Sequence, residues 1–271
     1  MKTSTLQVPG ASIYYEVWGS GPTLLLIPGG SGDTTSYTRV ARVLADRYTV
    51  VTYDPRGNSR SEIREPRGER QVEEYAHDAH LLLKEIGAEP AYIFGSSSGA
   101  QVGLDLVIRH PEQVRTLIAH EPPAVWMLPD GERWAAFLQK VQDTYNSEGA
   151  GPAMRRFAEG VGLRPQFDPQ GELPPGAKEL IARITANLEH FFAHELRSFA
   201  EYVPDVARLR GAPVVLAGGE ESREHMPYLA GAALAERLGI QVVDFPGDHV
   251  GYVGSPQAFA ERLHEVLLKN H

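Results

Sequence analysis

Short apolar runs alternate with helical patterns along most of this 271-residue chain, and this alternation is what most constrains its fold. The runs LQV (6–8) and IYYEVW (13–18) flank a Pro-Gly pair and predict a hairpin. TLLLI (23–27) is continuously apolar, as expected for a strand buried on both faces. Five more strands are expected at 48–53, 91–94, 114–120, 213–217 and 241–245. The pattern predicts an α/β fold with a mostly parallel eight-stranded sheet and helices on both faces.

The alternation stops after residue 121 and resumes near residue 213. Between these points the pattern is helical only, at about 131–147, 152–160 and 177–202. The segments on either side are each too incomplete to close a core alone. We therefore expect one core domain, residues 1–121 and 205–271, interrupted by a helical cap insertion at 122–204.

Charge and composition exclude several classes of function. Lys and Arg number 26 against 35 Asp and Glu, so the net charge of −9 argues against nucleic acid or an anionic membrane as partner. Without cysteine there is no disulfide, thiolate nucleophile or Cys-based zinc site. There is neither a signal-peptide-like start nor an apolar run of membrane-spanning length. We expect a cytoplasmic protein with a small-molecule substrate and no cofactor, and a homo-oligomer stays open.

The stretch FGSSSGAQVG (94–103) places three serines between two glycines, after an expected strand and before an expected helix. A strand, a sharp turn and a helix give the pattern G-x-S-x-G its meaning, because the turn lifts the central serine above the sheet. Ser97 alone has glycine at both −2 and +2, and we predict it to be a nucleophile. A bare solvated turn is the alternative.

An attacked carbonyl also needs donors for its oxyanion. The backbone N–H of Ser98 follows the nucleophile directly and is the first candidate. The second is the N–H of Gly30, in the loop PGGSGD (28–33), where Gly29 permits close approach and Ser31 is the neighbour. A phosphate-binding loop is the alternative, but G-x-G-x-x-G and Walker A motifs are absent.

A serine hydroxyl needs a base, and a base needs an acid that orients it. His249, in QVVDF-PGDHVGY, is expected on a loop after the last strand and is the predicted base. The loop AGGEES (217–222) follows another expected strand and offers Glu220 and Glu221 as acids. Asp54 and Arg56, in DPRGNSRS (54–61), are expected to pair with each other and fix that turn.

The expected cap has two further features. His190 and His194 have a spacing that can bind zinc, but H-E-x-x-H is absent, so we predict no metal site and assign them to packing or pocket lining. Trp126 is expected to contact substrate together with Gly29 and Ser31. The other cap aromatics could line an apolar pocket or form the cap's own core: Trp134, Phe137, Phe157, Phe191, Phe192 and Tyr202.

These motifs resemble the α/β-hydrolase superfamily over nearly the whole chain. The resemblance includes the opening hairpin, the PGG turn, the DPRGNSRS loop, the GSSSG elbow, the helical insertion and the late GDHVGY histidine. Pro28 departs from it, because many members have a histidine there that supports the oxyanion loop. Many members carry the acid three residues after a strand-ending glycine, which from Gly218 gives Glu221. Some place it after the sixth strand, which leaves Glu121 as a third candidate.

The resemblance implies a serine hydrolase with a Ser97–His249–Glu221 triad, cleaving a small apolar ester or lactone. A ligand-binding receptor of the same fold with little turnover is an alternative. A C–C hydrolase or lyase on the same scaffold is another.

Overall fold

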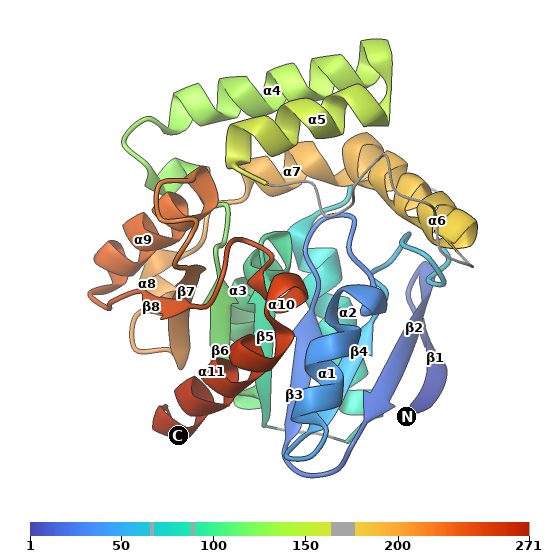
Figure 1. The fold of residues 1–271 in the computed structure, drawn as a ribbon, viewed down its shortest axis with the longest axis vertical. Coiled ribbons are helices and arrows are strands. Elements are labelled where there is room, and N and C mark those ends of the chain that lie inside the picture. The colour runs from blue at the N-terminus through green and yellow to red at the C-terminus, as the bar shows by residue number, and fades with distance from the viewer. Residues whose placement is uncertain (66–67, 88–89, 164–176, 271) are drawn as a thin grey trace.

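The computed structural model describes residues 1–65, 68–87, 90–163 and 177–270. An eight-stranded sheet runs through the molecule in the order β1-β2-β4-β3-β5-β6-β7-β8 (Figure 1). The hairpin strands β1 and β2 pair antiparallel, β2 pairs antiparallel with β4, and the remaining neighbours are parallel. The strands are β1 (Lys2–Val8), β2 (Ala11–Trp18), β3 (Thr23–Ile27), β4 (Thr49–Tyr53), β5 (Ala91–Ser96), β6 (Val114–His120), β7 (Val214–Gly219) and β8 (Val243–Phe245). The predicted fold class is confirmed.

Helices cover both faces of the sheet, because the parallel strands are apolar on both sides. On one face, α1 (Thr38–Leu44), α10 (Gly251–Gly254) and α11 (Pro256–Lys269) share a core with Phe94 and Phe245. On the other face are α2 (Val72–Glu85), α3 (Ser98–Arg109), α8 (Val206–Leu209) and α9 (Met226–Leu238). Short 3₁₀ turns lie at Thr34–Tyr37, Pro111–Gln113 and Val125–Met127.

Four helices between β6 and β7 lie together over one end of the sheet (Figure 1). We call them the inserted helices: α4 (Gly131–Glu148), α5 (Ala150–Val161), α6 (Ala177–His190) and α7 (Leu196–Glu201). They have a core of their own, which includes Leu138, Val141 and Phe192. The part of the predicted 122–204 insertion at 164–176 lies outside the described residues. Within the described chain, no helix combines the length and apolar character needed to cross a membrane.

The helix expected over 177–202 is interrupted by a π-helical turn at Phe191–Glu195. The turn coincides with buried polar contacts, because Glu195 accepts a hydrogen bond from the Tyr75 hydroxyl and lies 3.3 Å from His190. A π turn adds a residue to the helical repeat and so redirects the side chains that follow it. Sequence periodicity cannot anticipate such a turn, since its partners come from α2.

The loop after β4 differs from its prediction. Arg56 forms two hydrogen bonds with Asp78 on α2, at 2.7 and 2.6 Å. Asp54 instead accepts from Arg60 and from the backbone N–H of Thr34. The expected Asp54–Arg56 pair is therefore wrong, because each side chain finds its partner on a neighbouring element.

Two glycines allow the tight passage from β5 to α3. A Cβ added at Gly95 would lie 2.3 Å from the carbonyl oxygen of Gly99. A Cβ added at Gly99 would lie 2.3 Å from the carbonyl oxygen of Ile27, on β3. Both contacts are with backbone, which cannot swing aside. The glycines are thus required by the close packing of α3 on the ends of the strands.

We expect Gly99→Ala to lower the free energy of unfolding by about 1–3 kcal/mol or more, since the new methyl group overpacks backbone. Gly254→Ala is the matched control, because a Cβ there meets nothing within 4 Å. That variant should stay within about 0.5 kcal/mol of wild type. Urea unfolding midpoints measure both, and equal losses in the two variants would contradict the packing argument.

Candidate active site

Ser97 is the single residue between the end of β5 and the start of α3. Its backbone has φ 56° and ψ −126°, which is strained for a residue with a Cβ. The Ser97 N–H donates to the carbonyl oxygen of His120 at 2.9 Å, which fixes the turn to β6. Ser97 is half-buried, whereas Ser96 is wholly buried and Ser98 only 7% exposed. Of the three serines, the middle one is held in the elbow conformation.

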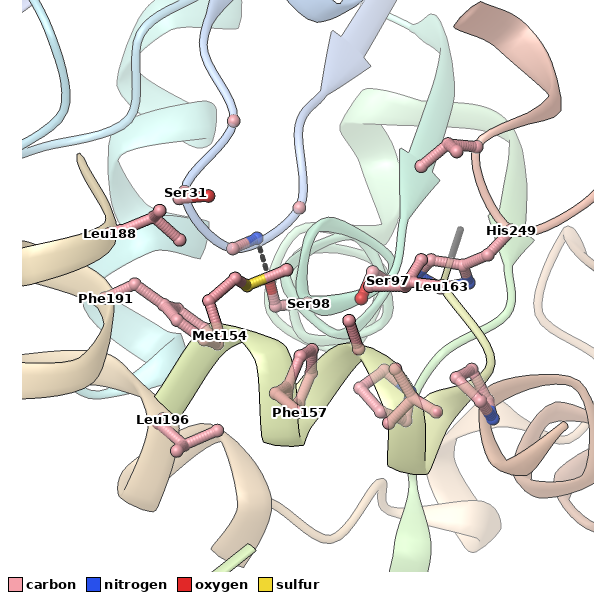
Figure 2. A pocket seen from close by; sticks show the side chains of 18 of the residues that line it. Ser31, Ser97, Ser98, Met154, Phe157, Leu163, Leu188, Phe191, Leu196 and His249 are labelled. Carbon is pink, nitrogen blue, oxygen red and sulfur yellow. Dashed lines mark hydrogen bonds between the residues drawn. The ribbon is translucent and has the colours of Figure 1, made fainter. Parts of the chain in front are cut away.

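His249 lies on the loop between β8 and α10 and is buried. The loop passes directly over Gly219, where an added Cβ would lie 2.6 Å from the carbonyl oxygens of Gly247 and Asp248. His249 and Ser97 line the same pocket. Figure 2 draws both side chains at this pocket. The structure therefore brings the predicted nucleophile and base to one site.

The acidic partner of His249 is Glu121, the residue that follows β6. Its Oε2 is 2.5 Å from Nδ1 of His249. Its Oε1 accepts from the backbone N–H of Gly219 at 2.7 Å and from the hydroxyl of Ser222. Glu121 is completely buried and has φ 49°, so its backbone also lies in the left-handed region.

Glu121 therefore replaces Glu221 as the candidate acid. Glu221 and Glu220 are both exposed, and the backbone N–H of Glu221 donates to the carbonyl oxygen of Gly247 at 3.0 Å. The reason lies in the strand order: β6 lies next to β5, so a residue that directly follows β6 lies close to the serine elbow. The loop after β7 contributes its Gly219 N–H and Ser222 hydroxyl to orient Glu121 instead.

The electrostatics of this pair favour an ionised carboxylate. Burial by itself raises the pKa of Glu121, but the hydrogen bond and charge of His249, with smaller effects of His120 and Ser222, lower that pKa to about 2. Glu121 is thus negatively charged at neutral pH. A buried carboxylate on Nδ1 leaves Nε2 of His249 as the nitrogen able to accept a proton.

The residues of the two predicted oxyanion donors, Gly30 and Ser98, are in contact. The N–H of Gly30 donates to the side-chain oxygen of Ser98 at 2.5 Å, shown as the dashed line in Figure 2. Gly30 has φ 39°, and an added Cβ at Gly29 would lie 2.8 Å from Cβ of Ser97. The loop thus runs close to the elbow and aims a backbone N–H at it.

A pocket of about 580 Å³ lies between the serine elbow and the inserted helices. Gly29, Gly30 and Ser31 line it on the core side, as predicted for Gly29 and Ser31. Figure 2 shows Met154, Phe157 and Leu196 on the inserted helices at the pocket. The apolar lining is formed by Leu138, Met154, Phe157, Leu163, Leu188, Phe191, Leu196 and Phe199. The volume and lining suit an apolar small molecule.

Trp126 does not line this pocket, so its predicted contact with substrate is corrected. Its ring is 39% exposed, and its Nε1 donates to the carbonyl oxygen of Ala200 at 3.0 Å. The hydrogen bond ties the Val125–Met127 turn to α7 and turns the ring away. Of the cap aromatics, Phe157 and Phe191 do reach the pocket.

Histidines gather at two other places. His190 and His194 have rings 5.1 Å apart, with Glu195 beside His190. In the described part of the chain, one group of three residues has side-chain atoms close enough to hold a metal ion. It consists of His77, His80 and His110, whose ring nitrogens lie within 4.8 Å of one another. The rings of His80 and His110 are stacked 3.6 Å apart at 11°. Imidazole lone pairs lie in the ring plane, so stacked rings do not aim at one ion.

A further histidine lies behind the site. His120 is completely buried at the end of β6, beside the rings of Phe94 and Phe259, and its Nδ1 is 3.4 Å from the hydroxyl of Ser96. Burial lowers its pKa to about 4, despite the opposing charge of Glu121. His120 is therefore neutral at neutral pH and adds no charge beside Glu121 and His249.

The comparisons with known proteins agree with this architecture. A model of the alpha/beta hydrolase fold family matches residues 22–223. The chain belongs to this family, and its relatives identify it as a hydrolytic enzyme.

One curated relative is the uncharacterized hydrolase YraK of Bacillus subtilis, which is 42% identical over 99% of this chain and 97% of its own length. A zearalenone hydrolase of Bionectria ochroleuca is 26% identical and covers 98% of each chain. Among solved structures, a thermophilic esterase from Thermogutta terrifontis superposes with a TM-score of 0.76 at 20% identity, over 100% of both chains. The last likeness concerns the fold alone.

The buried His120 makes stability depend on pH. Unfolded His120 takes up a proton below its ordinary pKa of 6.5, whereas folded His120 does so only near 4. The unfolded state therefore binds more protons in this window, and we expect the wild type to lose stability as pH falls from 6.5 to 4. Urea unfolding across this range should show a smaller loss in His120→Asn. Parallel pH profiles for the two proteins would contradict this.

Proposed function

We propose that this enzyme is a serine hydrolase that cleaves carboxylic esters or lactones of apolar substrates through an acyl-enzyme. One observation carries the proposal: a strained elbow presents Ser97 to the pocket that His249 also lines, while a buried carboxylate holds Nδ1 of His249. A nucleophile, a base and an orienting acid in that arrangement constitute the machinery of acyl transfer.

In the first half-reaction, Nε2 of His249 accepts the Ser97 proton while Oγ attacks the substrate carbonyl. The intermediate collapses when the alkoxide leaves and takes that proton from His249. In the second half-reaction, His249 removes a proton from water as that water attacks the acyl carbon. The bond to Ser97 then breaks, Oγ takes the proton back from His249, and the acid is released. With a lactone, the leaving hydroxyl stays attached to the acyl chain, so one hydroxy acid is the product.

Glu121 keeps the imidazole in the reactive tautomer and stabilises the imidazolium that forms after each proton transfer. Its own hydrogen bonds from Gly219 and Ser222 leave it fixed, so little reorganisation accompanies the reaction. The low pKa of Glu121 means that His249, rather than the carboxylate, keeps the transferred proton.

The backbone N–H groups of Gly30 and Ser98 serve as the oxyanion donors. The hydroxyl of Ser98 accepts a hydrogen bond from the Gly30 N–H. An incoming carbonyl oxygen takes its place, and the N-terminus of α3 adds a favourable dipole at the same point.

The substrate class follows from the pocket. Apolar residues of α4 to α7 form most of its outer wall, so the inserted helices act as a cap that receives the apolar part of a substrate. The relative named as a zearalenone hydrolase supports zearalenone as one candidate substrate to test. We propose apolar acyl or aryl esters and lactones as the substrate class.

Ser97 should react with a fluorophosphonate probe and give a burst of p-nitrophenol with p-nitrophenyl esters, because the acyl-enzyme accumulates. Hexanoate and benzoate esters should have a higher kcat/KM than acetate, since they fill the apolar pocket. Ser97→Ala should abolish label and burst, and intact-mass spectrometry locates the label.

Ser96→Ala is the matched control and should keep most of the label, since Ser96 is wholly buried. An unlabelled wild type would refute the proposal. Ligand-induced thermal stabilisation without turnover would instead favour a receptor, and turnover of β-diketones but not esters would favour a C–C hydrolase.

Glu121→Gln should lower kcat by about 10⁴, the loss expected when an amide holds the imidazole in the wrong tautomer. Glu221→Gln, a matched change on an exposed loop, should leave kcat near the wild-type value. Steady-state hydrolysis of one ester by both variants measures the difference. A large loss in Glu221→Gln with little in Glu121→Gln would restore the acid chosen from sequence.

A further inference from the structure

The loop that carries Gly30 contains three glycines among residues 29–32, so its own side chains do little to fix it. Pro28 precedes it where many members of the family have a supporting histidine. An oxyanion donor is effective only if its N–H is already aimed at the developing charge. Something outside the loop must therefore hold it.

All four carbonyl oxygens of this loop accept a hydrogen bond. The oxygen of Gly29 accepts from the N–H of Gly32 at 2.8 Å, within the loop itself. The other three accept from two asparagine side chains. Asn58 Nδ2 donates to Gly30 O at 3.2 Å and to Gly32 O at 2.9 Å. Asn58 lies on the loop after β4 and is completely buried.

The second asparagine comes from the inserted helices. Asn187 lies on α6 and is 1% exposed, and its Nδ2 donates to the carbonyl oxygen of Ser31 at 3.0 Å. Its Oδ1 accepts from the backbone N–H of Ser59 at 2.8 Å. A backbone acceptor on one side and a backbone donor on the other fix the orientation of the amide. A carboxylate in this place would have no donor for Ser31.

The C-terminal end of α6, which carries Asn187, has two further close contacts with the core. A Cβ added at Gly57 would lie 2.3 Å from the ring of His190. A Cβ added at Gly30 would lie 3.5 Å from the ring of Phe191, on the π turn. The inserted helices therefore touch both the oxyanion loop and the loop that carries Asn58.

We propose that Asn58 and Asn187 are positioning residues that aim the Gly30 N–H at the oxyanion, and that Asn187 makes this alignment depend on how α6 is seated. Neither side chain lines the pocket, so both act on the reaction through the loop. A substrate that shifts α6 then changes the donor geometry as well as the pocket shape. This inference rests on the proposed function.

The test compares Asn187→Asp with the wild type on the best p-nitrophenyl ester. Asp keeps the size and the acceptor for Ser59 but removes the donor to Ser31. We expect kcat to fall about 10- to 100-fold. Complete removal of an oxyanion donor lowers kcat more, by about 10²–10³. KM should change by less than about threefold, because ground-state contacts stay in place.

A trifluoromethyl ketone with the same acyl chain supplies a second readout, because Ser97 adds to it and forms an oxyanion. Its Ki should rise in proportion to the loss in kcat/KM, as for a transition-state analogue. Asn58→Asp should behave similarly. Asn146→Ala, an exposed asparagine change on α4, is the control that should leave both constants unchanged.

If burial of a charge prevents Asn187→Asp from folding, Asn187→Ala replaces it, with thermal midpoints to establish folding. A folded variant with wild-type kcat and Ki would overturn the inference. So would a rise in KM alone, which would mean that Asn187 shapes the pocket. Both results leave Ser97 labelling intact, whereas failure of the proposed function removes labelling and hydrolysis from the wild type as well.

Discussion

The buried carboxylate of Glu121 is the interaction on which the rest of the site depends. It accepts from Gly219 at the end of β7, from Ser222 in the loop that follows, and from His249 after β8, and Glu121 itself directly follows β6. Three loops thus converge on one charge. A buried charge is stable only when it is fully paired. If the loops moved apart, the Glu121 carboxylate would lose its hydrogen bonds or become exposed to water. The same pairing keeps the imidazole aimed at the serine elbow.

Backbone packing supplies the second constraint. Gly95 and Gly99 let α3 begin almost in contact with β3 and β5, and Gly219 lets the histidine loop lie directly on β7. The active site is therefore rigid on its core side, where charge develops. The inserted helices form the other wall from apolar side chains, and meet the core through Asn187 and His190. Rigidity at the reacting atoms and adaptable apolar surface opposite them suit a hydrolase that distinguishes substrates by shape.

Much of this could be predicted from local patterns. The strand 114–120 was predicted to the residue, because an apolar run with prolines on either side defines it. Ser97 and His249 could be predicted because their motifs are contiguous in the chain, and the structure places both at one pocket. Glu121 was only a third candidate, since its role depends on β6 lying beside β5. Asn58 and Asn187 were missed altogether, because nothing in the sequence marks two asparagines 129 positions apart as partners of one loop.

The sequence by itself determined the order of strands and helices, the serine elbow and the histidine loop, since each arises from interactions between residues close together in the chain. Only the tertiary structure decided which carboxylate faces His249, which aromatic rings reach the pocket and what holds the oxyanion loop. These features depend on which strand ends become neighbours and on how the inserted helices pack on the core. They arise from hydrogen bonds and burial between segments that are far apart in the chain, which a local sequence pattern does not contain.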